Sequence, residues 1–141
     1  MQPRDVALLI ARGRIAIGAA FVLAPGLAGR LWIGSDAERR PVKLLVRGLG
    51  ARDMALGLGV VIALDRGAPV RGWLEGSALA DSADLLATLL AGGSISDDAR
   101  RATLLLAGGG AVLSAALARA LDEPAAAGEV HAPEAALTGH H

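Results

Sequence analysis

The longest uncharged segment of the chain reads ATLLLAGGGAVLSAALA and spans residues 102–118. It runs for more than four helical turns, and its leucines and valine insert favourably on membrane-insertion scales. A helix of about 20 mostly apolar residues is long enough to cross the hydrocarbon core of a bilayer. This segment therefore predicts a membrane-spanning helix over Asp98–Leu121.

Three earlier segments have a similar length and are separated by residues that end helices. They cover Val6–Ala24, Pro41–Leu64 and Val70–Ala91. The tight turn at residues 65–69 makes the second and third segments an antiparallel hairpin. No segment has a persuasive strand pattern. We therefore expect an all-α fold, a four-helix up-down transmembrane bundle.

Polar residues mark the starts of two of these helices. Ser35-Asp36-Ala37-Glu38 has the spacing of a capping box, and Pro41 follows in the first turn of the second long helix. Ser96 is expected to cap the last helix, where Asp97 and Asp98 lie at the positive end of the helix dipole. These residues set the expected helix starts.

The last residues differ in composition from the rest of the chain. Residues 124–141 are mainly Ala, Gly, Pro, Glu and His, too few of them large and apolar to offset the entropy of ordering. We expect a membrane domain over residues 1–123 and a disordered tail over 124–141. All three histidines lie in this tail, so the membrane domain has no imidazole for acid–base chemistry.

Composition excludes several classes of function. The chain is 53% hydrophobic and 20% charged, with 14 Lys plus Arg against 14 Asp plus Glu, so no net positive field attracts nucleic acid. It has no cysteine and none of the common phosphate-binding, zinc-protease or serine-hydrolase motifs. We therefore expect neither an enzyme nor a metal site, and no cofactor or nucleic-acid partner.

Charged residues interrupt the first three segments near their centres. Asp81 and Asp84 would each cost about 2.5–3.5 kcal/mol at the centre of a lone membrane helix, so pairing within a bundle is expected. Equal depth on antiparallel helices places Arg52 level with Asp81, and Arg14 level with Arg52 and Asp53. The sequence thus predicts a polar layer with Arg52–Asp81 as its central ion pair. Its members are Arg14, Arg52, Asp53, Asp81 and Asp84.

Small residues dominate the centre of the last segment. The same depth rule places Asp81 level with Gly109. A glycine within a helix costs about 1 kcal/mol relative to alanine, so close approach of another helix is the usual reason to keep it. We expect a helix-packing face formed by Gly108, Gly109, Gly110 and Ser114.

Two roles for the polar layer follow from these patterns. It either clamps the helices in register, as in a structural or interaction subunit, or forms a binding or transport site for a small molecule, a proton or an anion. The expected partners are the lipid bilayer and a second copy or a larger membrane complex. The expected location is the bacterial inner membrane, in several passes. A soluble four-helix bundle with its charges in water is the further alternative.

One short element carries a resemblance to a known family. Residues 50–53 read Gly-Ala-Arg-Asp and are followed by Gly-Leu-Gly at 57–59, and residues 14–18 read Arg-Ile-Ala-Ile-Gly. Over roughly residues 7–121 the chain resembles a family of small four-helix integral membrane proteins of bacteria and fungi. The resemblance implies a membrane location, and the family brings no established activity or catalytic residues. In helix count and size the chain is also similar to small membrane subunits of the DoxX type.

Overall fold

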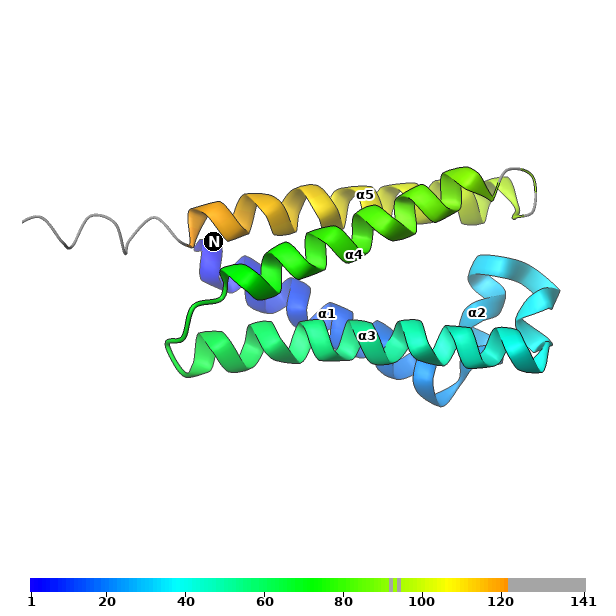
Figure 1. Ribbon diagram of the computed structural model, residues 1–141, viewed down its shortest axis with the longest axis horizontal. Coiled ribbons are helices and arrows are strands. Elements are labelled where there is room, and N and C mark those ends of the chain that lie inside the picture. Colours follow the sequence, from blue (N-terminus) through cyan, green and yellow to red (C-terminus); the bar gives the residue numbers. More distant parts are fainter. Residues whose placement is uncertain (92, 94, 122–141) are drawn as a thin grey trace, which may run out of the picture.

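The computed structural model describes residues 1–91, 93 and 95–121, and this part of the chain is all-helical (Figure 1). The all-α prediction is confirmed. The expected tail at residues 124–141, with its histidines, lies outside the described residues. The elements are α1 (Pro3–Leu23), α2 (Pro25–Ile33), the 3-10 helix η1 (Gly34–Glu38), α3 (Arg40–Asp65), α4 (Arg71–Leu90) and α5 (Asp97–Ala120).

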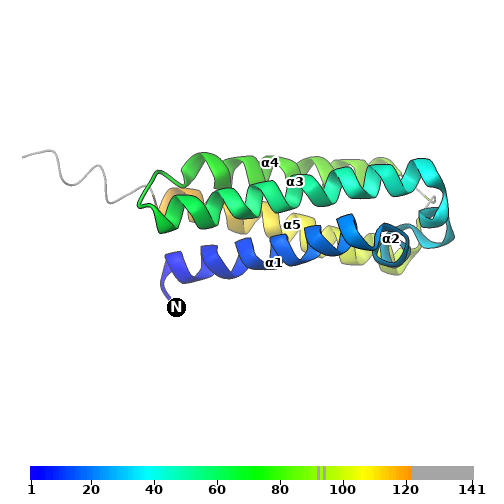
Figure 2. The ribbon, with the colours of Figure 1, turned by 90° about the horizontal axis from the view of Figure 1, so that it is seen from below.

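The four long helices α1, α3, α4 and α5 lie where the four apolar segments predicted them. They run alternately in opposite directions along the molecule, and short α2 lies with η1 at the end where α1 turns into α3 (Figures 1 and 2). Gly67 has φ +63° in the turn between α3 and α4, a left-handed conformation that glycine adopts without a steric penalty. The antiparallel arrangement follows from these short connections.

The predicted start of α5 is confirmed, and the predicted capping box before α3 is not. The Ser96 hydroxyl accepts a hydrogen bond from the Ala99 N–H at 3.3 Å, so the predicted N-cap of α5 is confirmed. The capping box at residues 35–38 is wrong, because these residues belong to η1 and Arg39 is the N-cap of α3. The Glu38 carboxylate binds Lys43 and Arg30 and is therefore not used as a backbone cap.

The long helices pack as two close pairs, α1 with α3 and α4 with α5. Glycines let the backbones of α1 and α3 touch. A Cβ added to Gly18 would lie 2.5 Å from the Gly50 carbonyl oxygen, and one on Gly57 would lie 2.6 Å from the Ala11 carbonyl oxygen. Because these neighbours are backbone atoms, a larger residue at either position would force the two helices apart.

Arginine side chains join the ends of this first pair. Arg4 of α1 donates from Nη2 to the Leu64 carbonyl at 2.9 Å, and Arg47 of α3 donates from Nε to the Val22 carbonyl at 3.2 Å. Carbonyls in the last turn of a helix have no partner within that helix. Each helix of the pair thus satisfies one such carbonyl at the C-terminal end of the other.

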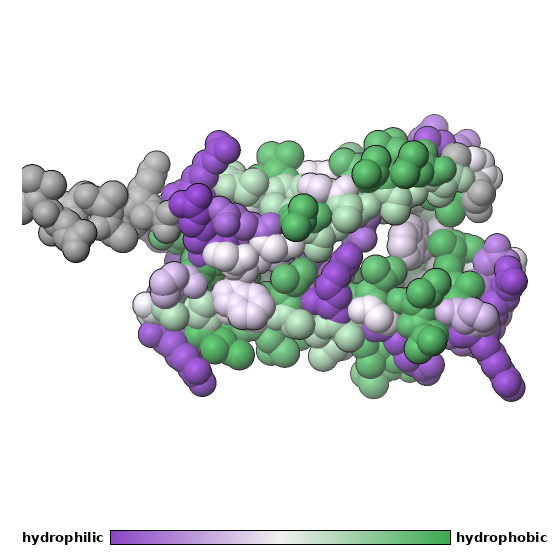
Figure 3. Space-filling view, in the orientation of Figure 1, coloured by the Kyte–Doolittle hydropathy of each residue, from purple (hydrophilic) through white to green (hydrophobic). Residues whose placement is uncertain are grey.

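Large apolar side chains are distributed in an unusual way. Among the described residues, the buried positions hold mostly alanine, valine, glycine and polar residues, whereas nineteen large apolar residues are exposed. The space-filling view shows apolar surface over much of the visible face, with hydrophilic residues at both ends and in a patch midway (Figure 3). The exposed set includes Leu9, Ile17, Leu44, Leu45, Leu79, Leu86, Leu90, Leu105, Leu106 and Val112.

Candidate functional site

Arg14 of α1 joins three helices near the middle of the molecule. Its Nη1 donates to Asp53 Oδ1 of α3 at 2.9 Å, and its Nη2 donates to Asp81 Oδ2 of α4. The side chains of Arg14, Asp53 and Asp81 are only 10%, 16% and 9% exposed. This buried group lies between the α1/α3 pair and the α4/α5 pair.

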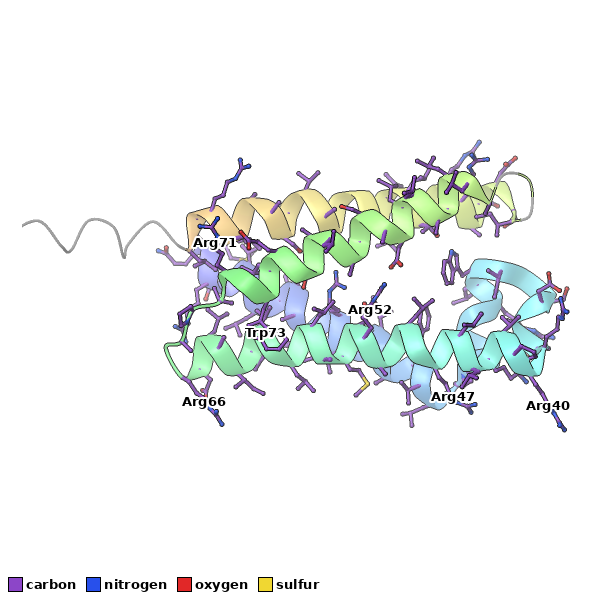
Figure 4. The ribbon with its side chains drawn as sticks, in the orientation of Figure 1. Arg40, Arg47, Arg52, Arg66, Arg71 and Trp73 are labelled. Carbon is purple, nitrogen blue, oxygen red and sulfur yellow. The ribbon has the colours of Figure 1, made fainter. Side chains whose placement is uncertain are left out.

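Arg52 extends the group toward the surface. It binds both oxygens of Asp84, at 3.0 Å from Nη1 and 2.7 Å from Nη2, and donates to Asp53 Oδ1 at 3.1 Å. Arg52 projects from α3 toward α4, at the place where the surface shows its midway hydrophilic patch (Figures 3 and 4). All five residues predicted for the polar layer therefore form one connected network, called the charged layer below.

The expected central pair of Arg52 with Asp81 is wrong. Arg52 binds Asp84, one helical turn further along α4, and Asp81 binds Arg14. Helical side chains lean toward the N-terminus of their own helix. On antiparallel helices Arg52 therefore leans toward the C-terminal end of α4, which brings its long side chain to Asp84 and leaves Asp81 to Arg14.

The charged layer has an uneven balance of charge. Two guanidinium groups, Arg14 and Arg52, face three carboxylates, Asp53, Asp81 and Asp84. Two positive and three negative charges leave one negative charge if every carboxyl group is ionised. A buried charge without a partner is costly, so the surplus negative charge favours binding of a positively charged species over an anion.

The predicted packing face on α5 holds in part. A Cβ on Gly110 would lie 2.6 Å from Asp81 Oδ2, so Gly110 makes room for the Asp81 carboxyl group. Ser114 is fully buried, and Gly108 lies in ordinary contact with Leu85. Gly109 is exposed with no atom within 4 Å of an added Cβ, so it does not pack within this part of the chain.

The inward face of α4 carries a polar stripe that the sequence-based prediction did not include. The buried residues of α4 are Leu74, Ser77, Asp81 and Thr88, so polar side chains outnumber apolar ones there. Their spacing of three, four and seven residues is the signal that could have found the stripe. Within the described residues the hydroxyls of Thr88 and Ser114 are buried and have no hydrogen-bond partner.

A second charged group lies at the α2 end of the molecule. Glu38 accepts a hydrogen bond from Lys43 Nζ at 2.7 Å and pairs with Arg30 Nε at 3.3 Å. The bond from Lys43 and its positive charge lower the pKa of the Glu38 carboxyl group. These side chains are a third to more than half exposed, so the group fastens α2 and η1 to α3 at the surface.

The described residues hold no three His, Cys, Asp or Glu side chains that converge as metal ligands. Two of the described helices, α1 and α5, are long and apolar enough to cross a membrane. Comparison of the chain with protein-family models, curated proteins and solved structures finds no match. The resemblance to small four-helix membrane proteins therefore stays a prediction.

Proposed function

We propose that the chain is a multi-pass integral membrane protein whose four long helices cross the bilayer, and that it serves as a small structural or interaction subunit. The single observation that carries this proposal is the reversed distribution of side chains. The charged layer lies inside together with alanines, glycines and valines, and large leucines, with Ile17 and Ile62, lie outside. Helix bundles in lipid commonly pack through small residues and keep ionisable groups inside.

The alternative of a soluble bundle does not fit this surface. The apolar windows of α1 and α5 are only 17% and 22% buried, whereas the core helix of a soluble protein is mostly buried. Monomeric soluble proteins rarely expose contiguous apolar patches larger than a few hundred Å². Large apolar side chains are exposed on all four long helices, and lipid is a solvent that suits them.

The charges of α3 and α4 are compatible with a bilayer because they are paired. Arg52, Asp53, Asp81 and Asp84 all take part in ion pairs inside the molecule. The insertion cost of a charged side chain falls when the group meets a partner before it meets lipid. The two helices are therefore proposed to insert as a hairpin together with α1 and α5.

Charged residues near the helix ends favour one orientation. Arg30, Arg39, Arg40, Lys43, Arg100 and Arg101 lie toward the α2 end, and Arg4, Arg66, Arg71 and Arg119 lie toward the opposite end. An excess of Lys and Arg marks the cytoplasmic side of membrane proteins. We therefore place the α2 end in the cytoplasm.

Arg12 supports a role in interaction with another chain. It is exposed on α1, about halfway along the helix, and forms no ion pair with the described residues. A lone arginine that faces lipid near the bilayer centre costs about 2.5–3.5 kcal/mol. An acidic or polar residue of a partner helix, or of a second copy, would remove this cost.

A second candidate function is favoured by the charged layer itself. Its surplus carboxylate is more than a simple clamp requires, and so are the buried hydroxyls of Thr88 and Ser114, which have no hydrogen-bond partner among the described residues. In this alternative the layer binds a small positively charged species. The proposal does not include an enzyme activity, because none of the described arrangements pairs a nucleophile with a base.

Membrane insertion is tested by fractionation of cells that express the full chain. We expect the protein in the membrane pellet after carbonate extraction, with a known peripheral protein released in the same sample. Recovery as a monodisperse soluble protein would overturn the proposal.

The role in interaction is tested by cross-linking in native membranes. Arg12→Leu should reduce cross-linking of the chain to a partner or to a second copy. A Leu substitution of Arg66, which is exposed at a helix end, should leave it unchanged.

A further inference from the structure

We propose that the charged layer takes up one proton from water and holds it on Asp81. This inference rests on the second candidate function, since it names the positively charged species that the layer binds. The starting observation is that three carboxylates share two guanidinium groups in the interior. Carboxylates that share a site do not all ionise readily, because each negative charge disfavours the next. One proton makes the layer neutral.

Asp81 is the carboxyl group of the layer that receives the fewest hydrogen bonds from guanidinium groups. Asp84 receives two hydrogen bonds from Arg52, and Asp53 receives bonds from both Arg14 and Arg52. Among the described residues Asp81 binds only the Nη2 of Arg14, through Oδ2, and its side chain is the least exposed of the three. The proton therefore forms an O–H bond at Asp81 Oδ1, and Oδ2 continues to accept from Arg14.

The charged groups around Asp81 come from three of the four long helices. α1 presents Arg14, α3 presents Arg52 and Asp53, and α4 itself adds Asp84. α5 packs closely on α4 and has no charged residue over residues 102–118. The neighbour of Asp81 on α5 is Gly110, which has no side chain. Within the described residues, no further positive group balances the third carboxylate.

Two buried hydroxyls form a second, independent observation. Ser114 lies one turn after Gly110 on α5, and Thr88 lies one turn after Asp84 on α4. They are 0% and 2% exposed, and neither hydroxyl oxygen has a partner among the described residues. Each side chain leans toward the N-terminus of its helix, and therefore toward the charged layer. Buried hydroxyls are normally satisfied by protein or water, so these two suit an exchangeable proton and the water that delivers it.

A proton fits the layer better than a metal ion or an anion. No three carboxylates or imidazoles converge as metal ligands within the described residues. An anion would add to the existing surplus of negative charge. A proton needs no cavity, and its uptake involves no transfer of electrons.

The test is carbon-13 NMR of the aspartate carboxyl groups in the purified full chain in detergent micelles at pH 7. Asp→Asn variants assign the resonances. We expect one layer aspartate, Asp81, at the chemical shift of a neutral carboxylic acid, and Asp53 and Asp84 at the shifts of carboxylates. Absence of any neutral aspartic-acid signal from the unmodified protein would overturn the proposal, and this outcome needs no assignment and no variant.

Variants make the count of protons a sharper test. Asp81→Asn leaves two carboxylates and two guanidinium groups, so no layer aspartate should remain protonated at pH 7. Asp65→Asn, at the exposed end of α3, is the matched control and should leave the neutral carboxyl signal in place. If the neutral signal persists in Asp81→Asn on Asp53 or Asp84, the assignment to Asp81 is wrong.

The same spectra separate a proton from an alkali cation. They are recorded in sodium, potassium and choline salts at equal ionic strength, and we expect identical carboxyl shifts in all three. Loss of the neutral signal in sodium or potassium alone would show that a metal cation supplies the positive charge and would overturn the proposal. Failure of the membrane proposal would appear in the fractionation instead, because these shifts do not depend on insertion.

Discussion

At the residue scale, Asp81 is the side chain that connects three of the long helices. It belongs to α4, accepts a hydrogen bond from Arg14 of α1, and fills the space left by Gly110 of α5. The sequence predicted that Asp81 lies level with Gly109 and pairs with Arg52. The predicted depth along the bundle is correct, and the predicted ion-pair partner is wrong. Partner choice depended on the direction in which each side chain leans, and residue spacing alone does not give that direction.

A pair of double-mutant cycles tests this choice of partner. Arg14→Leu leaves buried Asp81 without a guanidinium partner and leaves Asp53 with Arg52 alone, a change of the kind that costs about 3–5 kcal/mol in a buried ion pair. Combined with Asp81→Leu it should cost less than the sum of the single changes, by about 0.5–3 kcal/mol. The measurement is the free energy of unfolding in detergent.

The control cycle joins Arg52→Leu with Asp81→Leu, residues that share a network without touching directly. Its coupling should be clearly smaller than that of Arg14 with Asp81. A larger coupling between Arg52 and Asp81 would restore the register expected from the sequence and contradict the structure.

Gly110 and Gly109 form a matched pair of neighbours on α5. An added Cβ at Gly110 meets the Asp81 carboxyl group at 2.6 Å, whereas one at Gly109 meets nothing within 4 Å. Gly109→Ala should stabilise the protein by about 0.5–1 kcal/mol through helix propensity. Gly110→Ala should lower the thermal midpoint, because Arg14 holds Asp81 in place. Equal midpoints for the two variants would show that Asp81 moves away freely.

At the element scale, helix boundaries were largely predictable and helix pairing was less so. The turn at residues 65–69 and Ser96 act through local backbone chemistry, so they marked the end of α3 and the start of α5 correctly. The capping box before α3 failed because residues 35–38 form η1 and the Glu38 carboxylate pairs with Lys43 and Arg30, which lie outside the four-residue pattern. Contacts with residues outside a short motif compete with the motif and can override it.

The close pairing of α1 with α3 was not foreseen. The run of glycines in α5 led to the prediction that this helix packs most closely. The closest contacts between helix backbones instead involve Gly18, Gly50 and Gly57. Gly50 and Gly57 are seven residues apart and thus lie on one face of α3, as do Ala11 and Gly18 on α1. This heptad spacing of small residues on two neighbouring helices was the available signal.

Gly57→Ala tests the importance of that contact. The new methyl group would lie 2.6 Å from the Ala11 carbonyl oxygen, a backbone atom that moves only if the helix moves. We expect a loss of about 1–3 kcal/mol in unfolding free energy, as for an overpacked core. Gly48→Ala in the same helix has open space and should be neutral or stabilising. If both variants unfold alike in detergent, α1 and α3 do not pack through Gly57.

At the scale of the whole molecule, the arrangement of α1, α3, α4 and α5 places the charged layer inside and most of the described leucines outside. Composition alone predicted concentrated apolar segments, and the structure adds that their large side chains point away from the centre. The core cluster near the α3–α4 turn contains several small residues, among them Ala7, Ala11, Ala63 and Ala118. Such a core leaves many of the large apolar side chains exposed.

The most direct measurement uses the absence of cysteine from the chain, because a single introduced cysteine can be spin-labelled without background. Leu79 and Leu105, 73% and 77% exposed near the centres of α4 and α5, are compared with Ser35 and Arg66 at opposite ends, in liposomes. Labels at the two leucine positions should collide with dissolved oxygen and be shielded from a water-soluble nickel chelate, and the end positions should show the reverse. Equal access of the chelate to all four positions would contradict a membrane-embedded bundle.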